Sequence, residues 1–191
     1  LIPDRSTNAD IEKSIFGSNY NFIIPNAKNN SEISDKDWSS CDGILAWHDL
    51  RYDKDVIGKL NKCKGIVRVG TGYDNVDLTS CKKKGIIVSN VPDYGTEDVA
   101  DHTFALILAN ERNIINFNQA VKDKLPWDWS LGKNLSRIRE KVFGIIGLGR
   151  IGIAVAFRAK AFGFNVNFYD PYRSNGIEKS LNLSRSHSLK E

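Results

Sequence analysis

Short apolar runs alternate with amphipathic segments over the first half of the chain. Three apolar runs have the length and composition of buried strands, at 43–48, 65–70 and 86–90. The segments between them, 53–63 and 77–84, carry apolar residues at helical spacing, and Gly85 follows the second one as a helix-ending residue. Strands that alternate with helices predict parallel β–α–β units and an α/β fold. The run at 21–25 is a further candidate strand that precedes the others.

A long helix is predicted at 97–112, and helical character continues as far as Val121. Thr96 can cap this helix, and acidic residues fill its first turns, where the helix dipole favours them. Apolar residues surround most of the helix, so we expect it to be largely buried. A connecting segment with Trp, Pro and Gly follows at 122–136. The last elements predicted are a strand at 142–147, a helix at 150–162 and a strand at 165–170.

The sequence GLGRIG at 147–152 is the strongest chemical signal in the chain. It follows an apolar strand and opens a helix, which is the setting of a dinucleotide-binding loop. In such a loop Gly147 permits the tight turn, Gly149 lets a pyrophosphate approach the backbone, and Gly152 lets the helix pack closely against the strand. The free N–H groups of the helix N-terminus then bind the phosphates. A glycine-rich turn without a ligand is the alternative interpretation.

Asp170 ends the strand that follows this helix, 18 residues after Gly152. Its carboxylate is placed to accept hydrogen bonds from the adenosine ribose hydroxyls, and it would repel a 2′-phosphate. The sequence therefore favours NAD over NADP as the cofactor. Arg173 follows closely and can accommodate a 2′-phosphate, which leaves NADP as the less favoured alternative.

Arg68 stands inside an apolar strand, where a charge needs a partner. The sequence VGTG follows it at 69–72, so two glycines expose backbone N–H groups at the carboxyl end of the strand. Such a loop is suited to binding an anion. Ligand contact and a structural ion pair are both open for Arg68.

Composition and charge exclude several classes of protein. The chain has 191 residues, of which 41% are hydrophobic and 26% charged, with a formal net charge of +4, so it is neither disordered nor fibrous. No apolar run reaches the roughly 18 residues of a membrane span, and no basic face suggests nucleic-acid binding. The three cysteines include no C-x-x-C pair, which argues against a zinc site and fits a reducing compartment, the cytoplasm by default. Leu1 stands first and the chain has no Met, so we expect a truncated or processed chain.

The chain resembles the D-isomer-specific 2-hydroxyacid dehydrogenases, nearest to the branch of the C-terminal-binding-protein corepressors and their dehydrogenase relatives. The matching blocks lie at 68–77, 85–92, 97–108 and 144–172, while residues 1–42 match weakly. The resemblance implies a flavodoxin-like substrate domain and an NAD-binding Rossmann domain, both incomplete in this chain. We expect the first domain at 1–97 and the second at 98–191.

The resemblance also implies roles for particular residues. Trp47 and His48 would border the substrate pocket, where an aromatic ring limits side-chain size, although a core role for Trp47 is equally open. Arg68 would support the substrate or its loop, and Val69, Gly70 and Thr71 would hold the substrate carboxylate. The cofactor would contact Thr71, Thr103, Ile146, Gly147, Leu148, Gly149, Arg150, Ile151, Gly152 and Asp170. No metal site is expected.

The family's catalytic Arg, Glu and His would follow Glu191, outside this chain. His48, His102 and His187 do not stand in the catalytic position, and His102 is expected to be structural or at a domain contact. The first hypothesis is hydride transfer between NAD and a small 2-keto or 2-hydroxy acid in a homodimeric enzyme that binds neither nucleic acid nor membrane. The alternative is an NAD-sensing, corepressor-like interaction protein, for which a nuclear location is possible. The chain alone is expected to be inactive, to bind NAD weakly and to aggregate.

Overall fold

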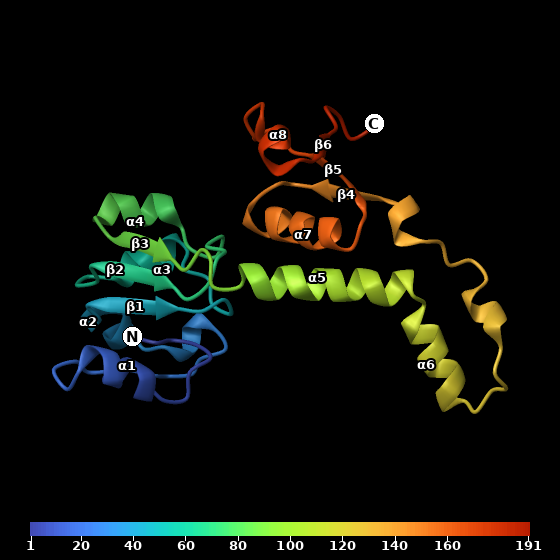
Figure 1. Ribbon diagram of the computed structural model, residues 1–191. Coiled ribbons are helices and arrows are strands. Elements are labelled where there is room, and N and C mark those ends of the chain that lie inside the picture. Colours follow the sequence, from blue (N-terminus) through green and yellow to red (C-terminus); the bar gives the residue numbers. More distant parts are fainter. The chain divides into compact units, whose positions relative to one another are not determined.

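A computed structural model describes residues 1–191 of the protein. The chain divides into two compact units, Leu1–Tyr94 and Gly95–Glu191, shown in blue to green and in green to red in Figure 1. The sequence predicts the boundary between the two domains three residues later, after residue 97. Each unit contains one small parallel sheet with helices packed on it, so the predicted α/β class is confirmed.

The first unit is built on three parallel strands in the order β1 (Gly43–Ala46), β2 (Gly65–Arg68) and β3 (Ile87–Asn90). Gly43 pairs with Gly65, and Gly65 pairs with Ile87, so the three strands are in register. All three were predicted, because strands buried on a face read as short apolar runs. The helices of this unit are α1 (Asp10–Phe16), α2 (Asp35–Ser40), α3 (Lys54–Lys59) and α4 (Leu78–Lys84), with a 3-10 turn at Asn30–Glu32.

Side chains cap three of these helices. Ser34, Asp53 and Asp77 each accept a hydrogen bond from a backbone N–H of the first helical turn of α2, α3 and α4. Gly85 ends α4 in a left-handed conformation with a φ of 70°, as its place after three lysines indicated. The sheet and these helices enclose one apolar core, in which Trp38, Tyr52, Ile57 and Ile66 are almost wholly buried.

The predicted strand at 21–25 is wrong, because these residues form no regular strand. They instead lie beside the first residues of the chain, where the Ile2 N–H donates to the Ile23 carbonyl oxygen at 2.9 Å. Leu1 in turn accepts from the Leu45 N–H at 2.9 Å, so the N-terminal residues run along the edge of β1. Pro3 and Pro25 have no backbone N–H, so neither can donate a hydrogen bond to a regular strand ladder.

The second unit contains strands β4 (Val142–Ile146), β5 (Asn165–Tyr169) and β6 (Ser184–Arg185), which form a parallel sheet in that order. Helix α7 (Arg150–Ala161) connects β4 to β5, as predicted, and α8 (Ile177–Leu181) precedes β6. Helices α5 (Thr96–Glu111) and α6 (Ile114–Lys122) open the unit, and 3-10 turns lie at Trp129–Gly132 and Ile138–Glu140. Apart from Lys122, the last residue of α6, the segment at 122–136 is a connection without a strand or an α-helix, as expected.

Helix α5 packs on the second unit by one face only. Phe104 is buried in an aromatic cluster with Phe143, Phe162 and Phe164, at ring-centroid distances of 4.8–6.3 Å. Arg158 of α7 forms ion pairs with acidic residues of α5, at 2.5 and 2.6 Å. Of the residues of α5 only Ala100 and Phe104 are buried, whereas Leu106 is 58% exposed. The expectation of a largely buried helix is therefore wrong, because the elements of the unit cover one side of it.

The three cysteines are all buried and free, in the core of the first unit. No helix combines the length and the apolar character that crossing a bilayer requires.

Candidate functional site

The glycine-rich loop joins β4 to α7 in the predicted strand–turn–helix arrangement. Gly147 has a φ of 90°, which an L-residue with a side chain rarely adopts, and its N–H donates to the Tyr169 carbonyl oxygen at 2.9 Å. A Cβ atom on Gly152 would lie 2.2 Å from the Gly147 carbonyl oxygen. The first turn of α7 therefore packs directly on the loop, and only glycine fits at position 152.

The N-terminus of α7 is open for a ligand. Gly149 is the N-cap residue in an extended conformation, and a Cβ atom built there would meet nothing within 4 Å. The first intrahelical bond runs from the Ile153 N–H to the Gly149 carbonyl oxygen at 3.0 Å. The N–H groups of Ile151 and Gly152 precede that bond, so α7 itself supplies them with no acceptor. This cradle fits a phosphate, because N–H groups and the helix dipole both favour an anion there.

Asp170 stands beside the same loop, directly after β5. One carboxylate oxygen accepts from the Leu148 N–H at 2.8 Å and the other from the Tyr172 N–H at 2.8 Å. These two N–H groups, with the Arg173 guanidinium nearby, hold the pKa of Asp170 below its usual range. The carboxylate is therefore ionised at neutral pH, and each oxygen keeps acceptor capacity for a ribose hydroxyl. Asp170 also supports the glycine-rich loop, a role that the sequence pattern did not show.

The other residues predicted to contact the cofactor differ in the exposure and hydrogen bonding of their side chains. The Leu148 side chain is wholly buried, so only its backbone belongs to the loop surface. Ile146 and Ile151 are exposed. The Thr103 hydroxyl donates to the Val99 carbonyl oxygen at 2.7 Å within α5, so its hydrogen atom is engaged by its own helix. Arg173 donates from Nε to the Leu148 carbonyl oxygen at 2.6 Å, which ties it to the loop.

In the first unit, the predicted substrate residues gather where β1 and β2 end. The Arg68 guanidinium folds over its own loop and donates to the Val69 carbonyl oxygen at 2.7 Å. A Cβ atom on Gly70 would lie 1.9 Å from Arg68 Nη1, so the guanidinium would have to move, and the φ of 152° at this position favours glycine. Arg68 Nε is buried and has no hydrogen-bond partner. The Thr71 side chain is exposed, and the loop is fixed to β3 by the bond from the Val91 N–H to the Gly70 carbonyl oxygen at 3.0 Å.

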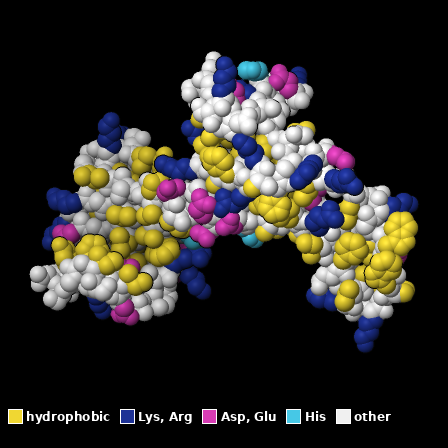
Figure 2. Space-filling model, viewed as in Figure 1, with side chains coloured by type: hydrophobic (Ala, Val, Ile, Leu, Met, Phe, Trp, Pro, Cys, Tyr) yellow, Lys and Arg dark blue, Asp and Glu magenta, His cyan; other side chains and the backbone are white.

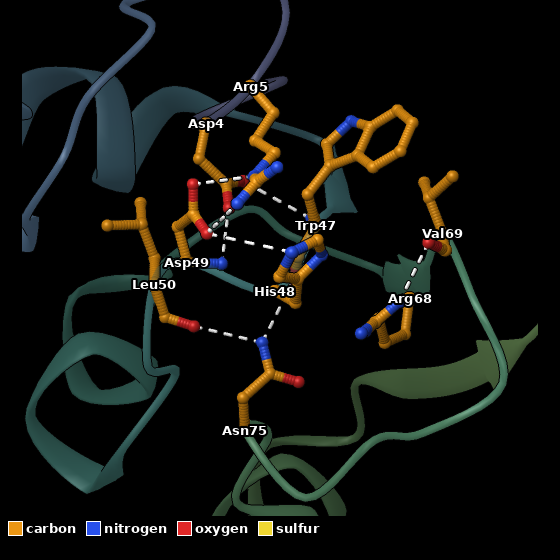
Figure 3. Close-up of polar contacts among 9 residues, drawn as sticks. All are labelled: Asp4, Arg5, Trp47, His48, Asp49, Leu50, Arg68, Val69 and Asn75. Carbon is orange, nitrogen blue, oxygen red and sulfur yellow. Dashed lines mark hydrogen bonds and ion pairs between the residues drawn. The ribbon is translucent and has the colours of Figure 1, made fainter. Parts of the chain in front are cut away.

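Trp47 and His48 follow β1 at the same end of the sheet, beside this loop. The Val69 N–H donates to the Ala46 carbonyl oxygen at 2.8 Å, which joins the two strand ends. Trp47 is half-buried, and the His48 side chain is 52% exposed. His48 Nε2 lies 3.7 Å from Asp49 Oδ1, and the Arg5 guanidinium holds the pKa of Asp49 below its usual range. The structure thus brings Trp47, His48, Arg68 and the loop at 69–71 together within one unit (Figure 3).

Sequence reasoning missed three residues of this region. Asp4, Arg5 and Asn75 all bond the turn that carries Trp47 and His48 (Figure 3). Asp4 and Arg5 follow an apolar run too short to predict a strand, and their partners lie more than 40 residues away along the chain. An acidic residue directly after Ile2 and Pro3 was the only local signal. His102 and His187 are exposed and lie in the second unit.

The family model of the D-isomer specific 2-hydroxyacid dehydrogenase catalytic domain matches residues 6–180. The chain belongs to the D-isomer specific 2-hydroxyacid dehydrogenase family. It is 41% identical to a D-3-phosphoglycerate dehydrogenase of Methanocaldococcus jannaschii over 150 residues, which is 78% of this chain and 28% of that protein. It is 31% identical to C-terminal-binding protein 1 of Caenorhabditis elegans over 178 residues, which is 86% of this chain and 23% of that protein.

Solved structures of the family show the same architecture. D-lactate dehydrogenase of Aquifex aeolicus, complexed with NAD and lactic acid, matches with a TM-score of 0.84 and 26% identity over 97% of this chain and 55% of its own. The acyclic imino acid reductase Bsp5, in complex with NADPH and D-Arg, matches with a TM-score of 0.79 and 28% identity over 97% of this chain and 59% of its own. The chain thus spans little more than half of these solved relatives and about a quarter of the two curated ones.

Proposed function

We propose that the protein containing this chain is an NAD-dependent oxidoreductase that transfers a hydride between the nicotinamide and the 2-position of a D-2-hydroxy or 2-keto acid. In this proposal the first unit belongs to a flavodoxin-like substrate domain and the second to a Rossmann domain. The observation that carries the proposal is the cradle at the N-terminus of α7, where Gly152 fits only as glycine and Asp170 is ionised beside the loop.

The residues of the second unit suit NAD. The backbone of the loop at 147–152 binds the pyrophosphate through N–H groups of the α7 N-terminus, and the space over Gly149 admits it. Asp170 accepts hydrogen bonds from the ribose hydroxyls of the adenosine. NAD, when bound, supplies the hydride acceptor or donor of the reaction. The ionised Asp170 disfavours a 2′-phosphate, and Arg173 is partly occupied by the Leu148 carbonyl oxygen, so NAD is preferred to NADP.

The residues of the first unit suit the carboxylate of the substrate. The Val69 and Gly70 N–H groups donate to the Ala46 and Arg68 carbonyl oxygens, each at 2.8 Å, so the Thr71 N–H is the backbone donor assigned to the carboxylate at the end of β2. The Arg68 guanidinium adds positive charge behind the loop. Arg68 is thus assigned to supporting the loop through the Val69 carbonyl oxygen rather than to polarising the reacting carbonyl. Trp47 limits the size of the substrate side chain, and His48 borders the same pocket. None of the three histidines of the chain is assigned to proton transfer, which is left, with the catalytic Arg and Glu, to residues after Glu191.

The test uses the full-length protein and a panel of 2-keto acids of increasing size. We expect NADH to be oxidised by at least one acid of the panel, with a lower KM for NADH than for NADPH. Binding of NADH without turnover of any acid would contradict the proposal. The companion variant is Asp170→Ser. We expect the KM values for NADH and NADPH to lie closer together in this variant than in the parent protein.

One observation favours a second candidate function. The 31% identity to C-terminal-binding protein 1 extends over 86% of this chain and so includes both units. In that case the same fold binds NAD as a signal and a partner peptide on the substrate domain, with a nuclear location. A protein that binds NADH, reduces no 2-keto acid and binds a defined peptide with one-to-one stoichiometry would support this function and exclude the first.

A further inference from the structure

The turn at 47–50 is held at almost every backbone position by side chains from elsewhere in the chain. The Asp4 carboxylate accepts from the Trp47 N–H at 3.2 Å through one oxygen and from the Asp49 N–H at 3.0 Å through the other. On the other side, the Asn75 amide donates to the Trp47 carbonyl oxygen at 3.0 Å and to the Leu50 carbonyl oxygen at 2.9 Å. Figure 3 shows Asp4 above this turn and Asn75 below it.

Asp4 is unusual for a carboxylate, because it has no exposed surface. A buried carboxylate costs free energy unless N–H groups satisfy it, and here both donors that satisfy its two oxygens come from the turn. Burial raises the pKa of the neighbouring Tyr52 phenol above its ordinary range, and the Asp4 carboxylate raises it further. The Asp4 carboxylate is therefore buried inside the unit and directed at this turn.

Arg5 adds a second attachment beside Asp4. Its guanidinium donates from Nε and Nη2 to both carboxylate oxygens of Asp49, at 2.7 and 2.8 Å. The residue has a φ of 60°, a left-handed conformation that is costly for an arginine and persists only where surrounding contacts impose it. Such conformations cluster at functional sites, and this one places the Asp4 and Arg5 side chains on the same turn.

Asn75 connects the turn at 47–50 to the loop that follows β2. It lies in the loop that follows β2, a few residues after Arg68, Gly70 and Thr71. Its backbone is also fixed, because the Tyr52 N–H donates to the Asn75 carbonyl oxygen at 2.8 Å. With the backbone of the turn held from both sides, the Trp47 ring and the His48 imidazole are the groups that project from it (Figure 3).

We propose that Asp4 and Asn75 are positioning residues that fix the Trp47–His48 turn against the loop at 69–71 and so set which 2-keto acid side chains the protein accepts. This inference rests on the proposed function. Neither residue is placed in contact with the substrate. Each acts through the backbone of the turn, so loosening either one lets the Trp47 ring move and relaxes the limit on substrate size.

The test compares Asp4→Asn and Asn75→Asp with Asp53→Asn in the full-length protein. Asp53 is the matched control, because it also accepts two backbone N–H bonds, from Asp55 and Val56 at 3.0 Å each, but at the start of α3. The first readout is amide hydrogen exchange. We expect faster exchange at residues 47 and 49 in Asp4→Asn, and unchanged exchange there in the Asp53 variant.

The second readout is the ratio of kcat/KM for 4-methyl-2-oxopentanoate to that for pyruvate. We expect both positioning variants to raise this ratio roughly threefold to tenfold, the scale of one ordinary hydrogen bond, with the KM for NADH unchanged. In a Trp47→Ala background, which removes the size limit, the Asp4 change should alter the ratio little. If Asp4 were merely structural, its replacement would lower the turnover of both acids equally. Alternatively, it would change the kcat/KM ratio by the same factor in the parent and in the Trp47→Ala background.

Three outcomes overturn the inference. In the first, the kcat/KM ratio of the two acids is the same in the positioning variants as in Asp53→Asn. In the second, the effect of Asp4→Asn on this ratio is additive with that of Trp47→Ala. In the third, amide exchange at residues 47 and 49 does not change. Failure of the proposed function looks different, because the parent protein then reduces no 2-keto acid at all, and the selectivity role is lost with it.

Discussion

At the scale of single residues, the same substitution at two glycines of one loop should differ in its effect on the free energy of unfolding. In Gly152→Ala the new Cβ meets the Gly147 carbonyl oxygen at 2.2 Å, so α7 must move away from the loop. We expect this variant to lose about 1–3 kcal/mol of unfolding free energy, the usual cost of overpacking, measured by urea denaturation. The full-length variant should also bind NADH at least roughly tenfold more weakly, a change of about 1.4 kcal/mol.

Gly149→Ala is the matched control, because its Cβ meets nothing within 4 Å and its φ of −77° suits alanine. The free energy of unfolding should therefore stay within about 0.5 kcal/mol of the parent value. The added methyl lies where the proposed function places the pyrophosphate, so NADH binding should still weaken. Equal unfolding free energies for the two variants would show that the close approach at position 152 is absent.

The ionisation of Asp170 makes the stability of the second unit depend on pH. Its pKa is lowered by hydrogen bonds from the Tyr172 and Leu148 N–H groups. A carboxyl group whose folded pKa is depressed stabilises the fold above its unfolded pKa, about 3.9, and this contribution disappears as the pH falls through the folded value. We expect Asp170→Asn to flatten the acid limb of the stability curve below about pH 4. The measurement is urea unfolding between pH 2 and pH 7, and identical acid limbs for parent and variant would contradict the assignment.

The roles of single residues were predictable only where a local pattern exists. The pattern at 147–152 identified Gly147 and Gly152 correctly, because turn geometry and close packing are properties of a few adjacent residues. Asp4 and Arg5 could not be identified in this way. Their function depends on a turn more than 40 residues distant, and nothing near them in the sequence indicates that contact.

At the scale of secondary structure, α5 should be stabilised by one of its faces and not by the other. Phe104 is 5% exposed and lies among Phe143, Phe162 and Phe164. We expect Phe104→Ala to cost about 3–5 kcal/mol of unfolding free energy, because it leaves a cavity in this cluster. Leu106→Ala, two residues along the same helix, should change it by no more than about 0.5 kcal/mol because that side chain is 58% exposed. Urea denaturation of both variants is the measurement, and similar losses would refute the one-sided packing.

Elements were predictable where hydrophobic period and end signals agree. β1 to β5 and α7 follow from apolar runs and from glycine or capping residues at their ends. The degree of burial was not predictable for α5, since apolar residues surround it and the sequence does not show which side meets a neighbour. The strand predicted at 21–25 is wrong for another reason, because Pro3 and Pro25 prevent a regular ladder beside β1.

At the scale of the molecule, much apolar surface is exposed in each unit. In the first unit, Ile87 on β3 is 75% exposed, and Leu45 and Val67 on the same face of the sheet are only partly buried. Parallel sheets are normally covered on both faces. We therefore expect the 191-residue chain alone to aggregate at micromolar concentration and to bind a hydrophobic dye, measured by light scattering and dye fluorescence. A chain that stays monodisperse and binds no dye would contradict this.

In the second unit, hydrophobic side chains gather over α6 and the segment that follows it (Figure 2). The large exposed apolar side chains there are Ile114, Ile115, Val121, Leu125, Trp127 and Trp129. Tryptophan is rarely left exposed on a monomer and is enriched at the centre of protein interfaces. We predict that this surface is where the full-length protein forms a homodimer.

Trp127→Glu in the full-length protein tests this surface, because Trp127 is 87% exposed and its replacement places a charge within the apolar patch. An unpaired carboxylate desolvated in an interface costs several kcal/mol, enough to separate most dimers at micromolar concentration. Light scattering after size exclusion should give about half the parent mass for this variant. Ile15→Glu on α1 is the control, since it removes an apolar side chain that is 73% exposed from the other unit and should leave the dimer intact. A monomeric parent, or equal masses for the two variants and the parent, would show that the exposed tryptophans serve another purpose than pairing two copies of this chain.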